Sequence, residues 1–474
     1  MDSTWTHSDP SDAATAIVES PHIPSAPALP EPTKRAARRS VRQWLDLANR
    51  FVSSGLPRRA AKATDISEKV RITPENLVVI VRISSHHVSS TVAALNQEHG
   101  DKVVAHKTID CVWQHLTDTA RRQAVAEAIQ LASESAGVEP WSVFLSMSDP
   151  SISSRLAMGW ADPGDEVVLT ENEQLWALKR ARDQATGGDD ELVEAIPVQW
   201  TVRDRAGERE VANPVGERGS RLTCQALLVT ARSGYRAELE RLVDGLNIEV
   251  EGIIAQPVAL YRGIASLLPK KGSTLVIDCG ARCTTLIVRR RERLIHLQTH
   301  SFGGDDLTDA LATRLSVTPA QAEEMKRDLD ISLQADPFFH HEGQQFIWSE
   351  MRERHRLARP AAAVTGEMIE QFFRARAQEL RDAGLLGQQG QVHLFGRAST
   401  LGGLASRLRN VLDLPVVLGT GKRHRDPSAE MSDAIISGLV CAAADHRRMH
   451  LAAHPQRLRK TANGAWAWLT KPLE

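Results

Sequence analysis

The spacing of apolar residues changes along the chain from a period of two to a helical period and back, which predicts an α/β fold. From Asn76 the run LVVIVRISS predicts a buried strand and a turn, and STVAAL and KVVAHKTI continue a meander. Positions from Thr117 to Ala136 repeat at helical period, and GVEPWSVFLSM returns to a strand. Thr170 and Glu173 have the spacing of a capping box at the start of ENEQLWALKRARDQ.

The most informative stretch runs from Gln256 to Gly304. A helix that begins with QPVAL leads into the strand TLVIDCG, the hairpin ARCTTLIV and the pair Gly303-Gly304, which opens another helix. A strand that ends in aspartate, followed by small and polar residues at a turn, brings N–H groups and hydroxyls up to an anion. A glycine-rich helix start adds a positive dipole end. This order predicts a nucleotide fold of the actin/Hsp70 type.

Composition narrows the function classes. At 474 residues the chain is too long for one core, so several subdomains are expected. The formal net charge of -1 argues against a globally basic protein, and no nucleic-acid partner is expected. Five cysteines without zinc or redox spacing indicate free thiols in a reducing cytosol. No run of about twenty apolar residues and no signal-peptide pattern is found, so we expect the chain to stay in the cytoplasm.

The first 75 residues differ from the rest. Met1 to about Pro32 has no apolar period and predicts a disordered leader. From Pro32 to Lys62, nine Lys/Arg face a single acid, Asp46, and the apolar residues fall at helical spacing, which predicts a basic amphipathic helix. Two interpretations are open: contact with anionic lipid or an acidic partner, or packing on the body with a solvated charged face.

The order of several longer segments resembles the bacterial cell-division protein FtsA, a relative of actin. The segments are IPVQWTVRD, NPVGERGSRL, LLVTARSGYRAELERLVDGLNIEVEGIIAQPVAL and SFGGDDLTDALA, within a resemblance that covers roughly residues 76–445. It implies an actin-like fold of two ribonuclease H-like halves with an inserted small α/β subdomain. The expected parts are a leader and basic helix (1–75), a first half (76–110, 223–270 and 428–446), the insertion (111–222), a second half (271–305 and 388–427), a helical subdomain (306–387), and a linker with a membrane helix (447–474).

The resemblance also implies a nucleotide site, from which this chain departs. Where the family ends its first strand in a D-x-G type turn, Arg82 and Ser84 stand at the acid and the glycine. In the second loop Ala281, Arg282, Cys283 and Thr285 replace family residues, and in the third Arg397 and Ala398 replace two glycines. The nucleotide-binding candidates that remain are Ser85, His87, Asp278, Gly280, Thr284, Gly303, Gly304, Glu323, Lys326 and Gly396.

Three interpretations of this site are open. In the first, Arg82, Arg282 and Arg397 bind phosphate directly, since guanidinium matches phosphate geometry. In the second, these arginines fill the cleft with internal salt bridges. In the third, the cleft keeps ordinary but weak ATP binding. Each glycine replaced by arginine obstructs the ligand unless the side chain turns outward. Loss of the acid at position 82 weakens any Mg²⁺ site. We expect weakened or absent ATP binding without hydrolysis, no catalytic residue and no metal site.

The segment after the glycine pair is the expected binding site of a protein partner. By resemblance, 306–387 receives the C-terminal peptide of FtsZ, and Phe338, Phe339, Phe346, Trp348, Phe372 and Phe373 line a groove there or belong to the core. His340, His341 and Glu342 lack the spacing of a metal site.

The C-terminal tail predicts a membrane anchor. Its apolar stripe, two tryptophans and basic residues are typical of a helix that lies in the bilayer interface, or else of a tail docked on the body. The lipid-binding candidates are Leu458, Arg459, Lys460, Trp466, Trp468 and Leu469.

The expected function is therefore an adaptor that tethers FtsZ polymers to anionic lipid on the cytoplasmic face of the inner membrane, as a peripheral protein at the division site. Self-association and recruitment of later division proteins follow from the resemblance. The alternatives are an actin-like membrane scaffold for another assembly such as type IV pilus biogenesis, or an active ATPase of the same fold.

Overall fold

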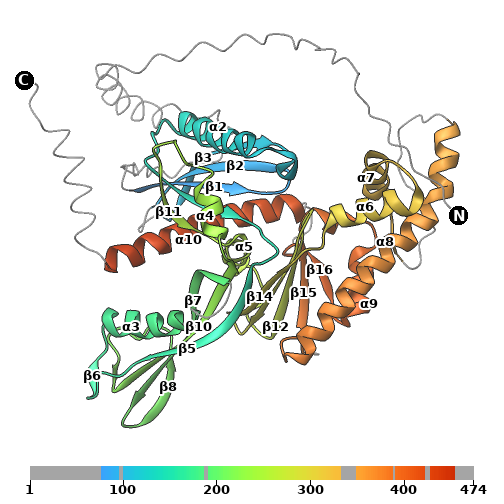
Figure 1. Ribbon diagram of the computed structural model, residues 1–474. Coiled ribbons are helices and arrows are strands. Elements are labelled where there is room, and N and C mark those ends of the chain that lie inside the picture. The colour runs from blue at the N-terminus through green and yellow to red at the C-terminus, as the bar shows by residue number, and fades with distance from the viewer. Residues whose placement is uncertain are drawn as a thin grey trace, which may run out of the picture. The chain divides into compact units, whose positions relative to one another are not determined.

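The computed structural model describes residues 76–95, 100–185, 190–332, 348–387, 390–421 and 427–453 (Figure 1). The predicted basic helix, the tail with its lipid-binding candidates and the aromatic residues 338–346 lie outside these ranges. Within them the chain builds two large sheets with helices between and around them, which confirms the actin-like α/β fold.

The first sheet has five strands in the order β11-β4-β1-β2-β3. The predicted meander forms its antiparallel part, and β4 and β11 add in parallel beside β1. Helix α2 packs against β2 and β3, and Thr117 caps it as its side chain accepts from the Ala120 amide. The elements are β1 (Leu77–Ile83), β2 (His87–Ala94), β3 (Lys102–Asp110), α2 (Asp118–Ala136), β4 (Ser142–Met147), α4 (Tyr235–Glu240) and β11 (Glu249–Ile253).

The second sheet has nine strands in the order β16-β15-β12-β13-β14-β5-β10-β7-β8. Its first five strands form the second half of the fold, in which β12 pairs with β13 in an antiparallel hairpin and with β15 in parallel. The elements of this half are β12 (Ser273–Cys279), β13 (Thr284–Arg290), β14 (Arg293–His300), α6 (Gly304–Leu315), α7 (Pro319–Asp328), α8 (Trp348–Asp382), β15 (Gly390–Phe395), α9 (Leu404–Leu412) and β16 (Val416–Leu418).

The remaining four strands of this sheet belong to the insertion, which α3 covers on one side. The predicted capping box of α3 is present, with Thr170 and Glu173 bonded reciprocally. The elements are β5 (Ser153–Ala161), β6 (Val167–Val168), α3 (Glu171–Arg182), β7 (Asp190–Asp204), β8 (Gly207–Val211), β9 (Arg218–Gly219) and β10 (Arg221–Arg232).

The expected limits of the insertion, residues 111 and 222, are wrong. Helix α2 and strand β4 belong to the first half, because β4 is hydrogen-bonded between β11 and β1. At the other end, β10 stays paired with β5 as far as Thr230. The insertion therefore lies between β4 and α4, after residue 147 and up to residue 232.

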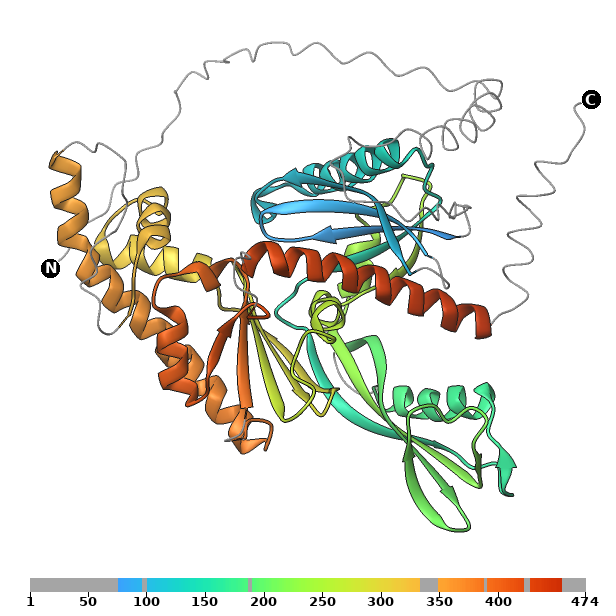
Figure 2. The ribbon, with the colours of Figure 1, turned by 180° about the vertical axis from the view of Figure 1, so that it is seen from behind.

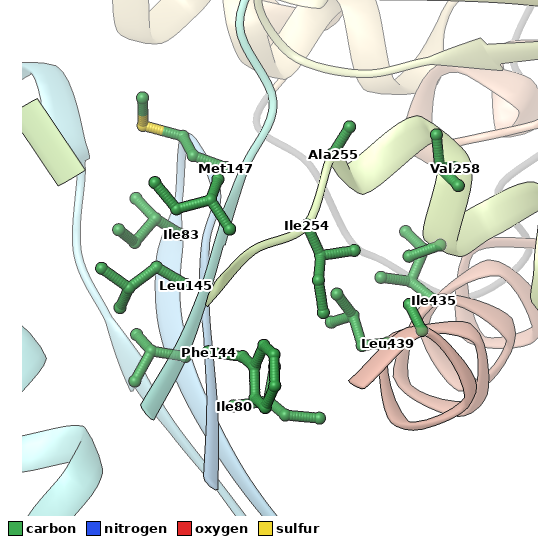
Figure 3. Packing of buried hydrophobic residues seen from close by; sticks show 14 of the residues in the cluster. Ile80, Ile83, Phe144, Leu145, Met147, Ile254, Ala255, Val258, Ile435 and Leu439 are labelled. Atoms are coloured by element: carbon green, nitrogen blue, oxygen red, sulfur yellow. The ribbon is translucent and has the colours of Figure 1, made fainter. Parts of the chain in front are cut away.

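Two helices lie between the sheets, α5 (Gln256–Ile264) and α10 (Pro427–Ala453) (Figures 1 and 2). Figure 3 shows side chains of β1 and β4, among them Ile80 and Phe144, packed toward Ile254 and Val258 and toward Leu439 of α10. All of these side chains are buried, so the first sheet and both helices share one hydrophobic core.

The crossing of α5 and α10 depends on two glycines. A Cβ added at Gly438 would lie 1.7 Å from the Ala259 carbonyl oxygen, and one added at Gly263 would lie 1.9 Å from the carbonyl oxygen of Ala434. Both contacts are to helix backbone, which cannot turn aside as a flexible side chain can. The helices are therefore closer than any larger residue at these two positions would allow.

We predict that Gly438→Ala lowers the stability of the protein by about 2 kcal/mol or more, because overpacking forces backbone shifts in a dense core. The urea midpoint of unfolding measures this. Gly387→Ala is the matched control, since a Cβ there meets no atom within 4 Å. Equal midpoints for the two variants would contradict the close helix contact.

Candidate nucleotide cleft

Most of the expected nucleotide residues stand on four turns that the two sheets carry. Ser85 and His87 lie at the turn between β1 and β2, where the Ser84 hydroxyl donates to the His87 carbonyl at 2.9 Å. Asp278, Gly280 and Thr284 belong to the hairpin of β12 and β13. The glycine pair opens α6, and Gly396 follows β15.

The hairpin turn and the glycine pair are in direct backbone contact. The Gly304 amide donates to the Gly280 carbonyl at 3.0 Å, and the Asp305 amide donates to Ala281 at 2.7 Å. A Cβ at Gly303 would lie 2.3 Å from the Ala281 oxygen. The hydroxyl of Thr284 donates to the Phe302 carbonyl at 2.7 Å. The packing of the two turns thus accounts for Gly303 without a ligand.

The turn after β15, at Gly396, packs against the end of β12. Gly396 has a φ of +91°, a conformation that side chains other than glycine rarely adopt. A Cβ here would meet the Cys279 carbonyl oxygen at 2.2 Å and Oδ1 of Asp278 at 2.7 Å. Asp278, Gly280, Gly303, Gly304 and Gly396 are therefore brought together, as the sequence predicts.

Glu323 and Lys326 of α7 belong to a closed polar network. Lys326 Nζ donates to the Gly304 carbonyl and to the Thr308 hydroxyl, both at 2.7 Å, and lies 2.5 Å from Glu323 Oε2. The Thr308 hydroxyl also donates to Glu323 at 2.7 Å. Burial raises the pKa of Glu323, but hydrogen bonds from Lys326 and Thr308 outweigh burial and leave the pKa lowered. At the start of α7, Thr318 and Gln321 form a capping box.

One residue that the sequence analysis left without a role completes the cleft. Gln256, at the start of α5, accepts a hydrogen bond of 3.2 Å from Nε of Arg82. Gln256 is 7% exposed and Arg82 is 5% exposed. Asp278 lies across from Arg82, and its Oδ1 is buried with no hydrogen-bond partner among the described residues. A polar residue at the start of an otherwise apolar helix was the only signal in the sequence for Gln256.

The electrostatics of the cleft follow from this arrangement. Burial raises the pKa of Asp278 to about 6, although the positive charge of Arg82 acts to lower it. Burial lowers the pKa of Arg82 to about 10, against the opposite effect of Asp278. For His87, burial and the charges of Arg82 and Arg397 lower the pKa to about 4. The imidazole is therefore neutral at physiological pH.

The two other arginines turn outward. Arg282 and Arg397 are exposed, and neither forms an ion pair with any residue that the structure describes. Among the described residues, neither arginine therefore fills the cleft with an internal salt bridge.

The described residues form no complete metal site from protein groups alone. Within the described ranges, no three His, Cys, Asp or Glu side chains group so as to hold an ion. Asp149, at the end of β4, already accepts from the amide and hydroxyl of Ser151 at 2.9 and 2.6 Å. A cavity of about 550 Å³ lies elsewhere, between β3 and α10, and shares no lining residue with the nucleotide candidates.

Of the expected groove aromatics, Phe372 and Phe373 of α8 have described side chains. Phe373 is buried in the core, and Phe372 stacks on Phe302 with ring centroids 4.2 Å apart. Both therefore pack against the body. None of the described helices combines the length and apolar character needed to cross a bilayer.

Comparison with known proteins finds one family. The model of "Cell division protein FtsA" matches residues 275–438. FtsA of Bacillus subtilis is 24% identical over 221 residues, or 47% of this chain and 50% of that protein. FtsA of Streptococcus pneumoniae is 24% identical over 301 residues, or 63% of this chain and 65% of that protein. The chain thus spans between half and two thirds of the length of these two relatives.

Among solved structures, the type IV pilus biogenesis complex PilM-PilN is similar with a TM-score of 0.51 and 18% identity. The match covers 78% of this chain and 99% of that chain. At this level of identity the likeness concerns the fold.

The pKa of Asp278 leads to a prediction. Because its folded pKa of about 6 lies above its ordinary value of 3.8, this carboxyl favours folding most below pH 3.8 and loses that contribution as the pH rises through 6. His87 has the opposite sign, since its contribution is lost as the pH falls from 6.5 through 4. The two effects offset each other in the wild type.

We therefore expect the stability difference, wild type minus Asp278→Asn, to fall by about 2 kcal/mol between pH 4 and 6. Urea unfolding at several pH values measures it, and Asp309→Asn, at an exposed position of α6, controls for the loss of one charge. A difference that stays flat or rises with pH would show that Asp278 is not buried as described.

Proposed function

Because the chain is a divergent relative of the cell-division protein FtsA, we propose that it tethers FtsZ polymers to the cytoplasmic membrane and helps to recruit later division proteins. The observation that carries this proposal is the family match over 275–438, which spans the second half of the fold from β12 into α10. The actin-like architecture supports it.

The FtsZ site is proposed on residues 306–387, where α6, α7 and α8 form a helical layer beside the second sheet. Arg314 of α6 and Glu367 of α8 pair at 3.1 Å, so α8 is tied to its neighbour. A helical layer of this kind can accept a short partner peptide between its helices. Phe372 and Phe373 stabilise the layer from within.

The membrane contact is proposed for the tail, through Leu458, Arg459, Lys460, Trp466, Trp468 and Leu469. Tryptophan rings sit at headgroup level, and basic residues near anionic lipid each contribute about 1 kcal/mol. We propose a peripheral protein on the cytoplasmic face of the inner membrane, at the division site, which also associates with further copies of itself.

The cleft is proposed to bind ATP weakly or not at all and to hydrolyse none. Its support is the lack of a complete metal site among the described residues and the internal bonds of Lys326, which engage the side chain expected beside adenosine.

We predict that FtsZ polymers pellet with anionic vesicles only when the full-length protein is present. The double variant Trp466→Ala, Trp468→Ala should abolish this, because it removes both interfacial rings. Trp176→Ala is the matched control, since Trp176 is an exposed tryptophan of the insertion. If the protein binds vesicles but leaves FtsZ in solution, the FtsZ role is wrong and a scaffold for another assembly, such as a pilus machine, is the better proposal.

A second prediction concerns the nucleotide. We expect the purified protein to release no phosphate from Mg²⁺-ATP above the buffer blank, since no described group of acids holds the metal. Micromolar binding of Mg²⁺-ATP together with turnover would instead identify an active ATPase.

A further inference from the structure

A buried cation lies where the central strands of the two halves end. Arg82 is the last residue but one of β1, and Asp278 is the last but one of β12. The guanidinium of Arg82 is oriented from a third element, because its Nε donates to Oε1 of Gln256 at the start of α5. Its position is thus set by the protein's own helix.

A charged side chain that is 95% removed from solvent requires an opposite charge. Asp278 is the charge that acts on it: burial shifts the pKa of both groups toward their neutral forms, and the charge of each opposes that shift in the other. No direct ion pair within 4.0 Å joins them among the described residues, and Oδ1 of Asp278 has no hydrogen-bond donor. The attraction therefore acts across the cleft and not through one shared hydrogen bond.

The surroundings of Asp278 are closed by backbone. Gly396 lies so near that a Cβ would stand 2.7 Å from Oδ1, and its φ of +91° excludes most other residues. The strand ends of the two sheets therefore carry one half-buried carboxylate, whose Oδ1 is buried, and one buried guanidinium. Mg²⁺ takes oxygen ligands and is held through carboxylates, and a fixed positive charge beside it repels it.

We propose that the Arg82 guanidinium is the permanent cation of this cleft: it takes the place of a divalent metal between β1 and β12 and joins the two sheets without a nucleotide. The inference deepens the proposal of a cleft without hydrolysis and is independent of the FtsZ role.

The test exchanges the internal cation for an added one. Arg82→Asp places two carboxylates opposite each other, so the variant should melt about 5–10 °C below the wild type in EDTA. Two facing carboxylates can bind Mg²⁺ between them, so millimolar MgCl₂ should restore at least half of the lost melting temperature. The wild type should melt at the same temperature with MgCl₂ and with EDTA. Thermal unfolding of the full-length chain provides the readout.

Arg397→Asp is the matched control, because it makes the same charge change at an exposed arginine of the same cleft. It should melt near the wild type and gain nothing from MgCl₂. The proposal is overturned if Arg82→Asp gains no more from MgCl₂ than this control, or if the wild type itself is stabilised by the metal.

A double-mutant cycle covers the case in which Arg82→Asp does not fold. Arg82→Met and Asp278→Asn each remove one charge of the pair, and the Tm of each single variant is measured beside that of the double variant. The double variant should lose clearly less than the sum of the two. Additive losses would show that Arg82 does not neutralise Asp278, and would equally overturn the proposal.

Discussion

The close crossing of α5 and α10 is the contact on which the rest of the structure depends. Gly263 and Gly438 let each helix approach the other's backbone, and both helices lie between the two sheets. Ion pairs hold the same helices at their far ends. Arg262 of α5 bonds Glu194 of the insertion at 2.6 Å and also Asp445 of α10, and Arg447 of α10 bonds Glu251 of β11 at 2.6 Å. Because α5 is fixed in this way at its C-terminal end, Gln256 at its start is held where it orients Arg82.

The cleft shows how a nucleotide motif can persist for reasons of packing. Glycine is needed at position 303 because a Cβ would clash with the carbonyl of Ala281, and at position 396 because it would clash with the carbonyl of Cys279. Lys326 is bonded to Gly304 and Thr308. Each of these residues would be retained in a protein that binds no nucleotide, so their presence alone does not indicate a ligand. Arg82 says more about the cleft, since it places a buried positive charge near the end of β1.

Local patterns predicted the local structure well. The capping box at Thr170, the hairpin after β12 and the helix at Gly304 follow from neighbouring residues, and all are present. The limits of the insertion could not be predicted, because they depend on which distant strands β4 and β10 pair with. The partner of Arg82 lies 174 residues away in sequence, and the hydroxyl of Thr308 reaches α7 only in the folded chain. A single sequence carries no signal for such contacts, although it did show that position 82 was unusual.

The most direct measurement is the amount of FtsZ polymer that the full-length protein carries down with anionic vesicles, determined with and without added ATP. We predict that FtsZ pellets equally in both conditions, because an adaptor whose cleft is held by its own arginine needs no nucleotide to work. FtsZ that stays in solution, or that pellets only when ATP is present, would contradict this.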